Sequence, residues 1–204
     1  AQVKEALEHH GVGPERIKIT GAYIFDKWFS GLHPSSSRRD FCRKYNLREK
    51  DPILLYLGTS RQLGGDESWI LPKLRKALDA RVQILLKPHP RNYENYKKVR
   101  PGVFTLLPSR GADTEEGLQD LYDFIYHSAA VTGINTSAMV EAAIIGKPVI
   151  SLLLKGYEKT QAQTEHFKQL LDEDVLYLAE TIEALPQLLS DILDGRDLKK
   201  EKRE

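Results

Sequence analysis

The sequence predicts an α/β protein built on a doubly wound parallel sheet. Two observations predict this class. From residue 53 onward, six short apolar runs of strand length alternate with segments whose apolar residues recur at helical spacing. Several of the runs also lack polar alternation, as expected when helices cover both faces of a sheet. The pattern therefore predicts about six successive strand–helix units.

Each unit begins with an apolar strand. The expected strands are Ile53–Leu57, Val82–Leu86, Val103–Leu107, Ala129–Thr132, Val149–Leu154 and Val175–Leu178. The helix that follows a strand has apolar residues three or four positions apart, which places them on one face. The expected helices cover Trp69–Leu78, Asn92–Val99, Leu118–Ile125, Met139–Ile144, Phe167–Leu171 and Ile182–Ile192.

Right-handed crossovers bring the carboxyl ends of parallel strands to one edge of a sheet, where ligands of such sheets bind. The loops at that edge are therefore the first place to look for function. They are Gly58–Gly65, Lys87–Arg91, Pro108–Thr114, Gly133–Ser137 and Lys155–Gln163.

The two ends of the chain depart from this pattern, which gives three expected regions: an N-terminal appendage or interdomain connector over 1–50, the α/β domain over 51–194, and a charged tail over 195–204. In the first region, Val3–His10 is expected to be a helix and Arg16–Thr20 a strand. The serines of Pro34–Ser37 are expected to cap a helix over Arg38–Tyr45. The tail Gly195–Glu204 is expected to fray.

Composition excludes several function classes. Thirty basic and 29 acidic residues give a net charge of +1, which argues against nucleic-acid binding because that needs a gathered basic excess. The single cysteine, Cys42, excludes an internal disulfide and a cysteine-based zinc site, and is expected to be buried. The six scattered histidines predict no metal site.

No apolar run is long enough to span a membrane, although peripheral association stays open. The N-terminus carries no secretory signal. Together with the lone thiol, this predicts a cytoplasmic protein.

The stretch from Ala129 to Ser137 carries the most chemistry. It runs from a buried strand through Gly133 into a helix that Asn135 or Thr136 can cap, and free amides at a helix start favour phosphate. Glu141 lies one helical turn after Ser137, where its carboxylate can accept hydrogen bonds from ribose hydroxyls. The alternative is a capped helix with a solvated glutamate.

Two other loops have residues suited to phosphate. Gly58-Thr59-Ser60-Arg61 combines a glycine with two hydroxyls and a guanidinium, and its alternative is an ordinary turn. In Lys87–Arg91, two prolines restrict the backbone around His89 between two cationic residues. His89 can donate to phosphate or assist proton transfer, and its alternative is a structural role.

Residues 132–149 read Thr-Gly-Ile-Asn-Thr-Ser-Ala-Met-Val-Glu-Ala-Ala-Ile-Ile-Gly-Lys-Pro-Val. This stretch resembles the nucleotide-binding segment of GT-B glycosyltransferases, and it is also similar to UDP-N-acetylglucosamine 2-epimerases and CDP-glycerol glycerophosphotransferases. The closer resemblance is to bacterial GT-B-like proteins of uncharacterised activity, which share the later pairs Thr160-Gln161 and His166-Phe167 and the earlier Thr20-Gly21-Ala22. It extends from about residue 9 to about residue 193.

The resemblance implies a Rossmann-like C-terminal lobe that binds a nucleotide-sugar donor, as in bacterial polysaccharide biosynthesis, with no cofactor. The acceptor lobe of such proteins would precede Ala1. The implied site includes Glu141 at the ribose and His89 as the catalytic candidate, with Lys87, Thr160 and Gln161 on the donor-side loop. The implied diphosphate contacts are Gly58, Thr59, Ser60, Arg61, Gly133, Asn135, Thr136 and Ser137.

Two other functions remain open. One is half of a sugar-nucleotide epimerase, although the sequence has no firm equivalent of the carboxylates or histidines that such an enzyme needs beside the sugar. The other is a non-catalytic Rossmann-like domain that binds nucleotides.

Overall fold

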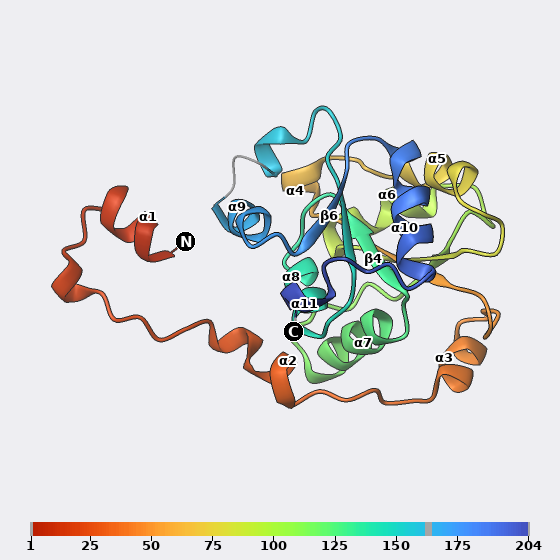
Figure 1. Ribbon diagram of the computed structural model, residues 1–204, viewed down its shortest axis with the longest axis horizontal. Coiled ribbons are helices and arrows are strands. Elements are labelled where there is room, and N and C mark those ends of the chain that lie inside the picture. The colour runs from red at the N-terminus through yellow and green to blue at the C-terminus, as the bar shows by residue number, and fades with distance from the viewer. Residues whose placement is uncertain (1, 162–164, 204) are drawn as a thin grey trace.

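The computed structural model describes residues 2–161 and 165–203. Its centre is a six-stranded parallel sheet, seen at the middle of Figure 1. The strands lie in the order β3-β2-β1-β4-β5-β6. The strands are β1 (Ile53–Leu57), β2 (Gln83–Lys87), β3 (Thr105–Leu106), β4 (Ala130–Gly133), β5 (Val149–Leu152) and β6 (Leu176–Ala179). The predicted doubly wound parallel sheet is confirmed, with the expected strands in the expected order along the chain.

Helices cover both faces of the sheet. In chain order, the helices of the described residues are α1 (Gln2–Glu8), α2 (Asp26–Ser30), α3 (Arg38–Lys44), α4 (Arg61–Gly64), α5 (Ile70–Ala77), α6 (Tyr93–Lys97), α7 (Glu115–Tyr126), α8 (Ala138–Ile144), α9 (Glu165–Asp172), α10 (Leu185–Leu193) and α11 (Lys200–Arg203), of which α1 lies away from the sheet. No helix in the described ranges has the length and apolar character needed to cross a membrane.

The alternation of side chains along β1 divides the core into two layers. Leu54 and Tyr56 face one side and pack with α5 and α10, whereas Ile53, Leu55 and Leu57 face the other side and pack with α3, α7 and α8. All five side chains are buried. A strand apolar at every position is stable only between two helical layers, because successive side chains point to opposite faces.

The strand expected at Val103–Leu107 is reduced to Thr105–Leu106 at the edge of the sheet. Val103 and Phe104 still pack against the core, but they pair with no neighbouring strand. A short edge strand limits the row of unpaired backbone groups exposed at the side of the sheet.

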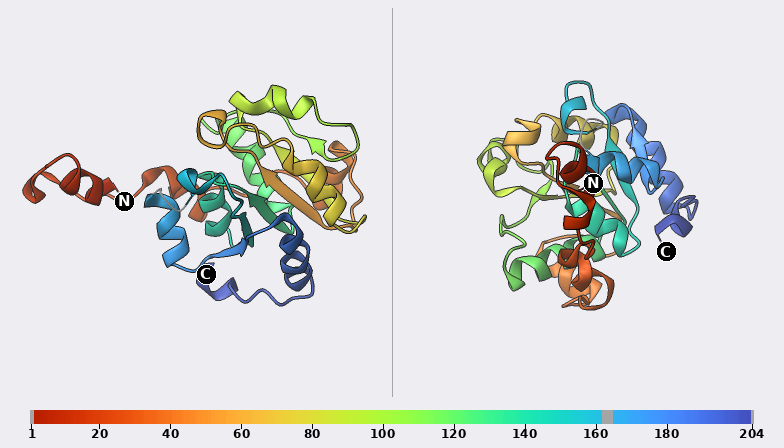
Figure 2. Two further views of the ribbon diagram at one scale, coloured as in Figure 1. Left: turned by 90° about the horizontal axis from the view of Figure 1, so that it is seen from above. Right: turned by 90° about the vertical axis from the view of Figure 1, so that its left-hand side faces the viewer.

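The first part of the chain extends away from the α/β body (Figures 1 and 2). The helix predicted near its start is present as α1. The strand predicted over Arg16–Thr20 is wrong: a short 3-10 turn covers Pro14–Arg16, and the following residues form no ladder. Apolar alternation cannot produce a strand where no neighbouring strand is available to accept its hydrogen bonds.

The segment containing α2 and α3 lies along α7. Trp28 of α2 is buried, with its ring centroid 5.8 Å from that of Tyr122. Ser37 caps α3 by accepting a hydrogen bond from the Asp40 amide, as the serine run predicted. Cys42 of α3 is buried in the same layer, also as predicted.

The fraying predicted for the charged tail is wrong. Residues 200–203 form α11, where the side chain of Arg203 is fully buried and donates to Asp197 and the Gly146 carbonyl. Asp197 also accepts a hydrogen bond of 2.9 Å from the Tyr177 hydroxyl. A charged segment therefore stays ordered because its charges pair with one another and with groups on the domain.

Candidate functional site at the carboxyl edge of the sheet

The direction of winding reverses between β1 and β4, which are neighbours in the sheet although two strands separate them in sequence. In an open α/β sheet, the loops after two such strands diverge and leave a crevice. A cavity of about 250 Å³ lies at this edge. The polar and charged residues that line it include Lys87, His89, Arg110, Thr136, Ser137 and Glu141, with Gly58 at the end of β1.

At two glycines of the predicted site, neighbouring atoms leave no room for a side chain. A Cβ on Gly58 would lie 2.7 Å from the Tyr96 hydroxyl, and a Cβ on Gly133 would lie 2.5 Å from the Leu57 carbonyl oxygen. Both distances are too short for any side chain. Gly133 does not line the cavity. Its absent side chain lets β1 and β4 lie close together at the point where their loops diverge.

Four of the polar residues predicted to contact the donor are buried in contacts within the protein. The hydroxyl of Thr59 donates to the Asn135 carbonyl at 3.0 Å, and the Asn135 amide donates to the Thr160 carbonyl. The Gln161 amide donates at 2.8 Å to the carbonyls of both Ile134 and Leu152. The side chains of Thr59, Asn135 and Gln161 thus join the loops after β4 and β5 to each other and to the β1 loop, whereas the Thr160 hydroxyl donates to the Tyr157 carbonyl in its own loop. The sequence predicted ligand contacts for these four residues.

The start of α8 also differs from the prediction. Neither Asn135 nor Thr136 caps the helix; Ser137 occupies the cap position, and its side chain makes no capping hydrogen bond. The hydroxyls of Thr136 and Ser137 have no hydrogen-bond partner among the described residues, and both residues line the cavity. The helix ends as predicted at Gly146, whose φ of +74° suits glycine.

Glu141 is the half-buried acid of this cavity. Burial raises the pKa of its carboxyl group from 4.5 to about 7. The Glu141 carboxylate has no hydrogen bond or ion pair with the described residues, although its backbone is bonded within α8. Removing a carboxylate from water without giving it donors costs free energy, so this group is suited to accept hydrogen bonds from a ligand.

Basic side chains also line the cavity. The ammonium of Lys87 donates to the Arg110 carbonyl at 2.6 Å, and burial lowers its pKa. Burial also lowers the pKa of His89, as do the charges of Arg91 and Lys87. The Nδ1 atom of His89 accepts a hydrogen bond of 3.2 Å from the Arg91 amide. A neutral imidazole that accepts at Nδ1 carries its proton at Nε2, so His89 is a hydrogen-bond donor at that atom.

Two residues predicted on the β1 loop lie outside the cavity. Ser60 precedes α4 without capping it, and Arg61 is exposed on the first turn of that helix. In the loop after β5, residues 162 and 163 lie outside the described part of the chain. The side chain of His166 is likewise not described, whereas its neighbour Phe167 is buried in the core.

Sequence reasoning missed the residues beneath the β1 loop. The carboxylate of Glu67 is fully buried and accepts hydrogen bonds from the Thr59 amide, from the Tyr96 hydroxyl at 2.6 Å and from the Tyr56 hydroxyl at 2.9 Å. Its sequence context, Gly64-Gly65-Asp66-Glu67-Ser68, has the polarity of a solvated turn. No local signal in the sequence could have shown that this acid is buried.

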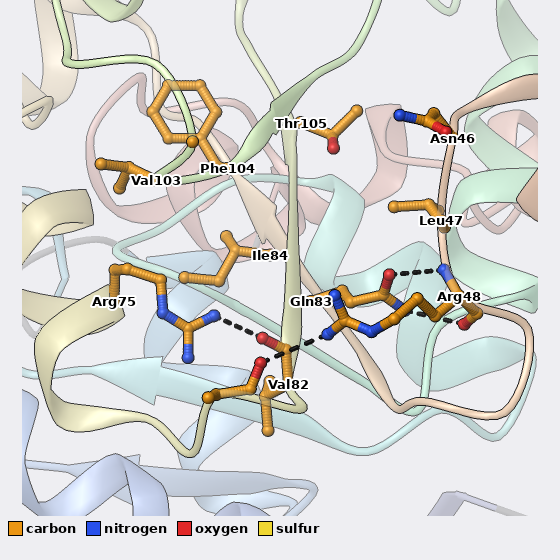
Figure 3. Close-up of a pocket in the computed structure, with 12 residues that line it drawn as sticks. Asn46, Leu47, Arg48, Arg75, Val82, Gln83, Ile84, Val103, Phe104 and Thr105 are labelled. Atoms are coloured by element: carbon orange, nitrogen blue, oxygen red, sulfur yellow. Dashed lines mark hydrogen bonds between the residues drawn. The ribbon is translucent and has the colours of Figure 1, made fainter.

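A second cavity, of about 320 Å³, lies at the opposite edge, where β2 and β3 begin (Figure 3). It contains two guanidinium groups, but both already bind the main chain. Arg75 donates to the carbonyls of Leu78, Asp79 and Val82, and Arg48 donates to those of Ala80 and Arg81. Its polar groups thus close the turns around α5 and β2. The described residues contain no cluster of three or more metal-binding side chains at either edge.

No protein-family model matches the chain, and no curated protein matches it. Solved structures do. A UDP-GlcNAc 2-epimerase from Methanocaldococcus jannaschii, solved with UDP-GlcNAc and UDP, superimposes with a TM-score of 0.62 at 15% identity, over 98% of this chain and 56% of that one. The wall teichoic acid polymerase TagF gives 0.64 at 17% identity, over 97% and 48%.

A third structure is itself an isolated domain: the C-terminal CMP-Kdo binding domain of WaaA from Acinetobacter baumannii. It gives a TM-score of 0.51 at 11% identity, over 81% of this chain and 92% of that one. The chain thus spans about half the length of the epimerase and of TagF, and most of the WaaA domain. These likenesses show the fold, which is the Rossmann-like fold of GT-B C-terminal lobes.

Proposed function

We propose that this chain is the donor-binding lobe of a GT-B-type glycosyltransferase and that it holds a nucleotide-sugar in the cavity at the carboxyl edge of the sheet. The observation that carries the proposal is Glu141: a half-buried carboxylate with no partner among the described residues, in a cavity whose other polar side chains are two hydroxyls, an imidazole and two cations. Two adjacent hydroxyls of a ribose would supply the missing donors.

The remaining groups suit the diphosphate of the same ligand. The hydroxyls of Thr136 and Ser137 are free to donate, Lys87 provides a positive charge, and His89 donates from Nε2. In glycosyl transfer, the bond from the anomeric carbon to the diphosphate breaks while the acceptor oxygen attacks that carbon. Donors held at the diphosphate stabilise the negative charge that develops on the leaving group.

This assignment narrows the predicted site. Thr59, Asn135, Thr160 and Gln161 act in it through the backbone that they position, not through side-chain contacts with the donor. The acceptor would come from a second lobe, consistent with the half-chain coverage of the epimerase and TagF.

The test is nucleotide binding by the 204-residue chain. Isothermal titration and thermal shift with UDP, CDP, CMP, GDP, ADP and UDP-GlcNAc are expected to show binding of at least one of them. Glu141→Ala is expected to weaken that binding at least about tenfold, the loss expected for hydrogen bonds to a charged group. Glu94→Ala on exposed α6 removes the same charge outside the cavity and is the matched control.

The proposal fails if the wild-type chain binds none of these compounds at millimolar concentration. It also fails if Glu94→Ala weakens binding as much as Glu141→Ala. Product analysis with UDP-GlcNAc and a complete two-lobed protein separates transfer or hydrolysis from epimerisation, and binding without turnover favours a non-catalytic domain.

A further inference from the structure

The β1 loop is held from beneath by groups that a ligand cannot reach. Thr59 is almost completely buried, and three of its hydrogen-bonding groups have partners. Its amide donates to Glu67, its hydroxyl donates to the Asn135 carbonyl, and its carbonyl accepts from the Asn92 amide at 3.2 Å. The backbone of the loop is therefore positioned by side chains outside the cavity.

Glu67 is the centre of this arrangement. One carboxylate oxygen accepts from both the Thr59 amide and the Tyr96 hydroxyl, and the other accepts from the Tyr56 hydroxyl. Among the described residues it has no ion pair, and these three donors are the groups that compensate its desolvation there. A buried acid without a cation is a costly way to stabilise a loop, because an apolar side chain would pack there without that cost.

The same arrangement sets the spacing of the cavity walls. The Tyr96 hydroxyl that donates to Glu67 also touches the open side of Gly58, which lines the cavity. Thr59 extends the connection to Asn135, the residue before Thr136 and Ser137. A displacement of the Glu67 carboxylate would therefore move Gly58 relative to the start of α8.

From these contacts we infer that Glu67 is a positioning residue, which fixes the Gly58–Thr59 backbone against the start of α8 so that the cavity matches the diphosphate of a nucleotide. The inference rests on the proposed function. Glu67 is fully buried and acts only through Thr59 and Tyr96. It is thus a determinant of nucleotide affinity that makes no contact with the nucleotide.

The test measures affinity and stability separately, with UDP as the probe or whichever compound of the panel above the wild type binds. Glu67→Gln keeps the shape of the side chain but leaves only one acceptor oxygen for three donors. Tyr96→Phe removes one donor to Glu67 and leaves the carboxylate in place. The matched control is Tyr177→Phe on β6. This variant removes a buried tyrosine hydroxyl that donates to Asp197, away from the β1 loop.

The expected result is that all three variants lower the melting temperature of the ligand-free chain. Only Glu67→Gln and Tyr96→Phe are expected to weaken nucleotide binding, about tenfold and about threefold respectively, because the Gly58–Thr59 backbone would shift relative to the diphosphate. If Glu67→Gln does not fold, Tyr96→Phe against Tyr177→Phe decides the question alone.

Unchanged affinity in Glu67→Gln and Tyr96→Phe, with lowered melting temperatures, would overturn the inference and leave the proposed function standing, because Glu67 would then be structural only. Equal losses of affinity in Tyr96→Phe and Tyr177→Phe would overturn it in the same way. Absence of binding by the wild type would refute the proposed function and this inference with it.

Discussion

The cavities at the two edges of the sheet contain similar numbers of polar groups but use them differently. At the amino edge, Arg48 and Arg75 donate to main-chain carbonyls, and the Gln83 amide exchanges hydrogen bonds of 2.6 and 2.9 Å with the Arg48 backbone (Figure 3). At the carboxyl edge, Glu141 and the hydroxyls of Thr136 and Ser137 have no partner among the described residues.

This difference in hydrogen bonding indicates which of the two cavities is the ligand site. Neither cavity volume nor the number of guanidinium groups identifies the ligand site, since the amino-edge cavity has the larger volume and two such groups, Arg48 and Arg75. What separates them is whether polar atoms already have partners. The amino-edge groups bond to one another and to the main chain and so stabilise the fold, whereas the partly buried Glu141 carboxylate has no such partner and is available to a ligand.

The largest expected difference between the two edges is in the stability cost of replacing a glycine. Gly133→Ala places a Cβ 2.5 Å from the Leu57 carbonyl and should cost about 3 kcal/mol or more, because the clash is with backbone inside the sheet. Gly102→Ala at the amino-edge cavity meets no atom within 4 Å and should cost only about 1 kcal/mol, from its φ of +86°. Urea unfolding measures both, and equal costs would contradict the close packing of β1 against β4.

Removing one cation from each cavity should distinguish an effect on stability from an effect on nucleotide binding. Arg75→Ala removes a donor from three carbonyls, of which that of Asp79 keeps the Val82 amide, and is expected to cost about 2 kcal/mol of stability, with unchanged nucleotide affinity. Lys87→Ala is expected to weaken nucleotide binding about fivefold, through loss of a charge facing the phosphates, with a smaller change in stability. Titration and urea unfolding of both variants would contradict the assignment if the two effects were reversed.

The stability of the chain should depend on pH through the Glu141 carboxyl group. Burial raises the pKa of Glu141 from 4.5 to about 7, so the folded chain retains a proton that the unfolded chain loses. Stability from this group is fully present below pH 4.5 and is lost as the pH rises through 7. Glu141→Gln should therefore raise the melting temperature by a few degrees above pH 7 and leave it unchanged below pH 4.5.

The control for this pH effect is Glu94→Gln, whose exposed carboxylate pairs only with Lys97 on the surface. It should change the melting temperature little at either pH. A Glu141→Gln profile parallel to that of the wild type would show that the Glu141 carboxylate is solvated after all.

The smallest expected effect is that of Arg61, and it tests where the site ends. Arg61 was predicted at the diphosphate, but it is exposed on α4 and does not line the cavity. Arg61→Ala is expected to change stability by less than about 0.5 kcal/mol and nucleotide affinity by less than about twofold. A tenfold loss of affinity on titration would place the phosphates nearer to α4 than the cavity does.

The class of fold followed from the sequence alone, because short apolar runs without polar alternation, each followed by a segment of helical spacing, are typical of strands that helices cover on both faces. The sequence also determined which loops meet at one edge, since parallel strands with helical crossovers leave no other arrangement. The turn at Gly133 and the acid at Glu141 could be located for the same local reason, the strand–turn–helix pattern around them.

Only the tertiary structure decided which polar side chains are free. Thr59, Asn135 and Gln161 have the same chemistry as ligand-binding residues, yet their partners lie on loops distant in the sequence. Glu67 was invisible for the same reason: its burial depends on Tyr56 and Tyr96, 11 and 29 residues away. Local pattern specifies secondary structure, but whether a hydrogen-bonding group is satisfied depends on contacts that form only when the chain folds.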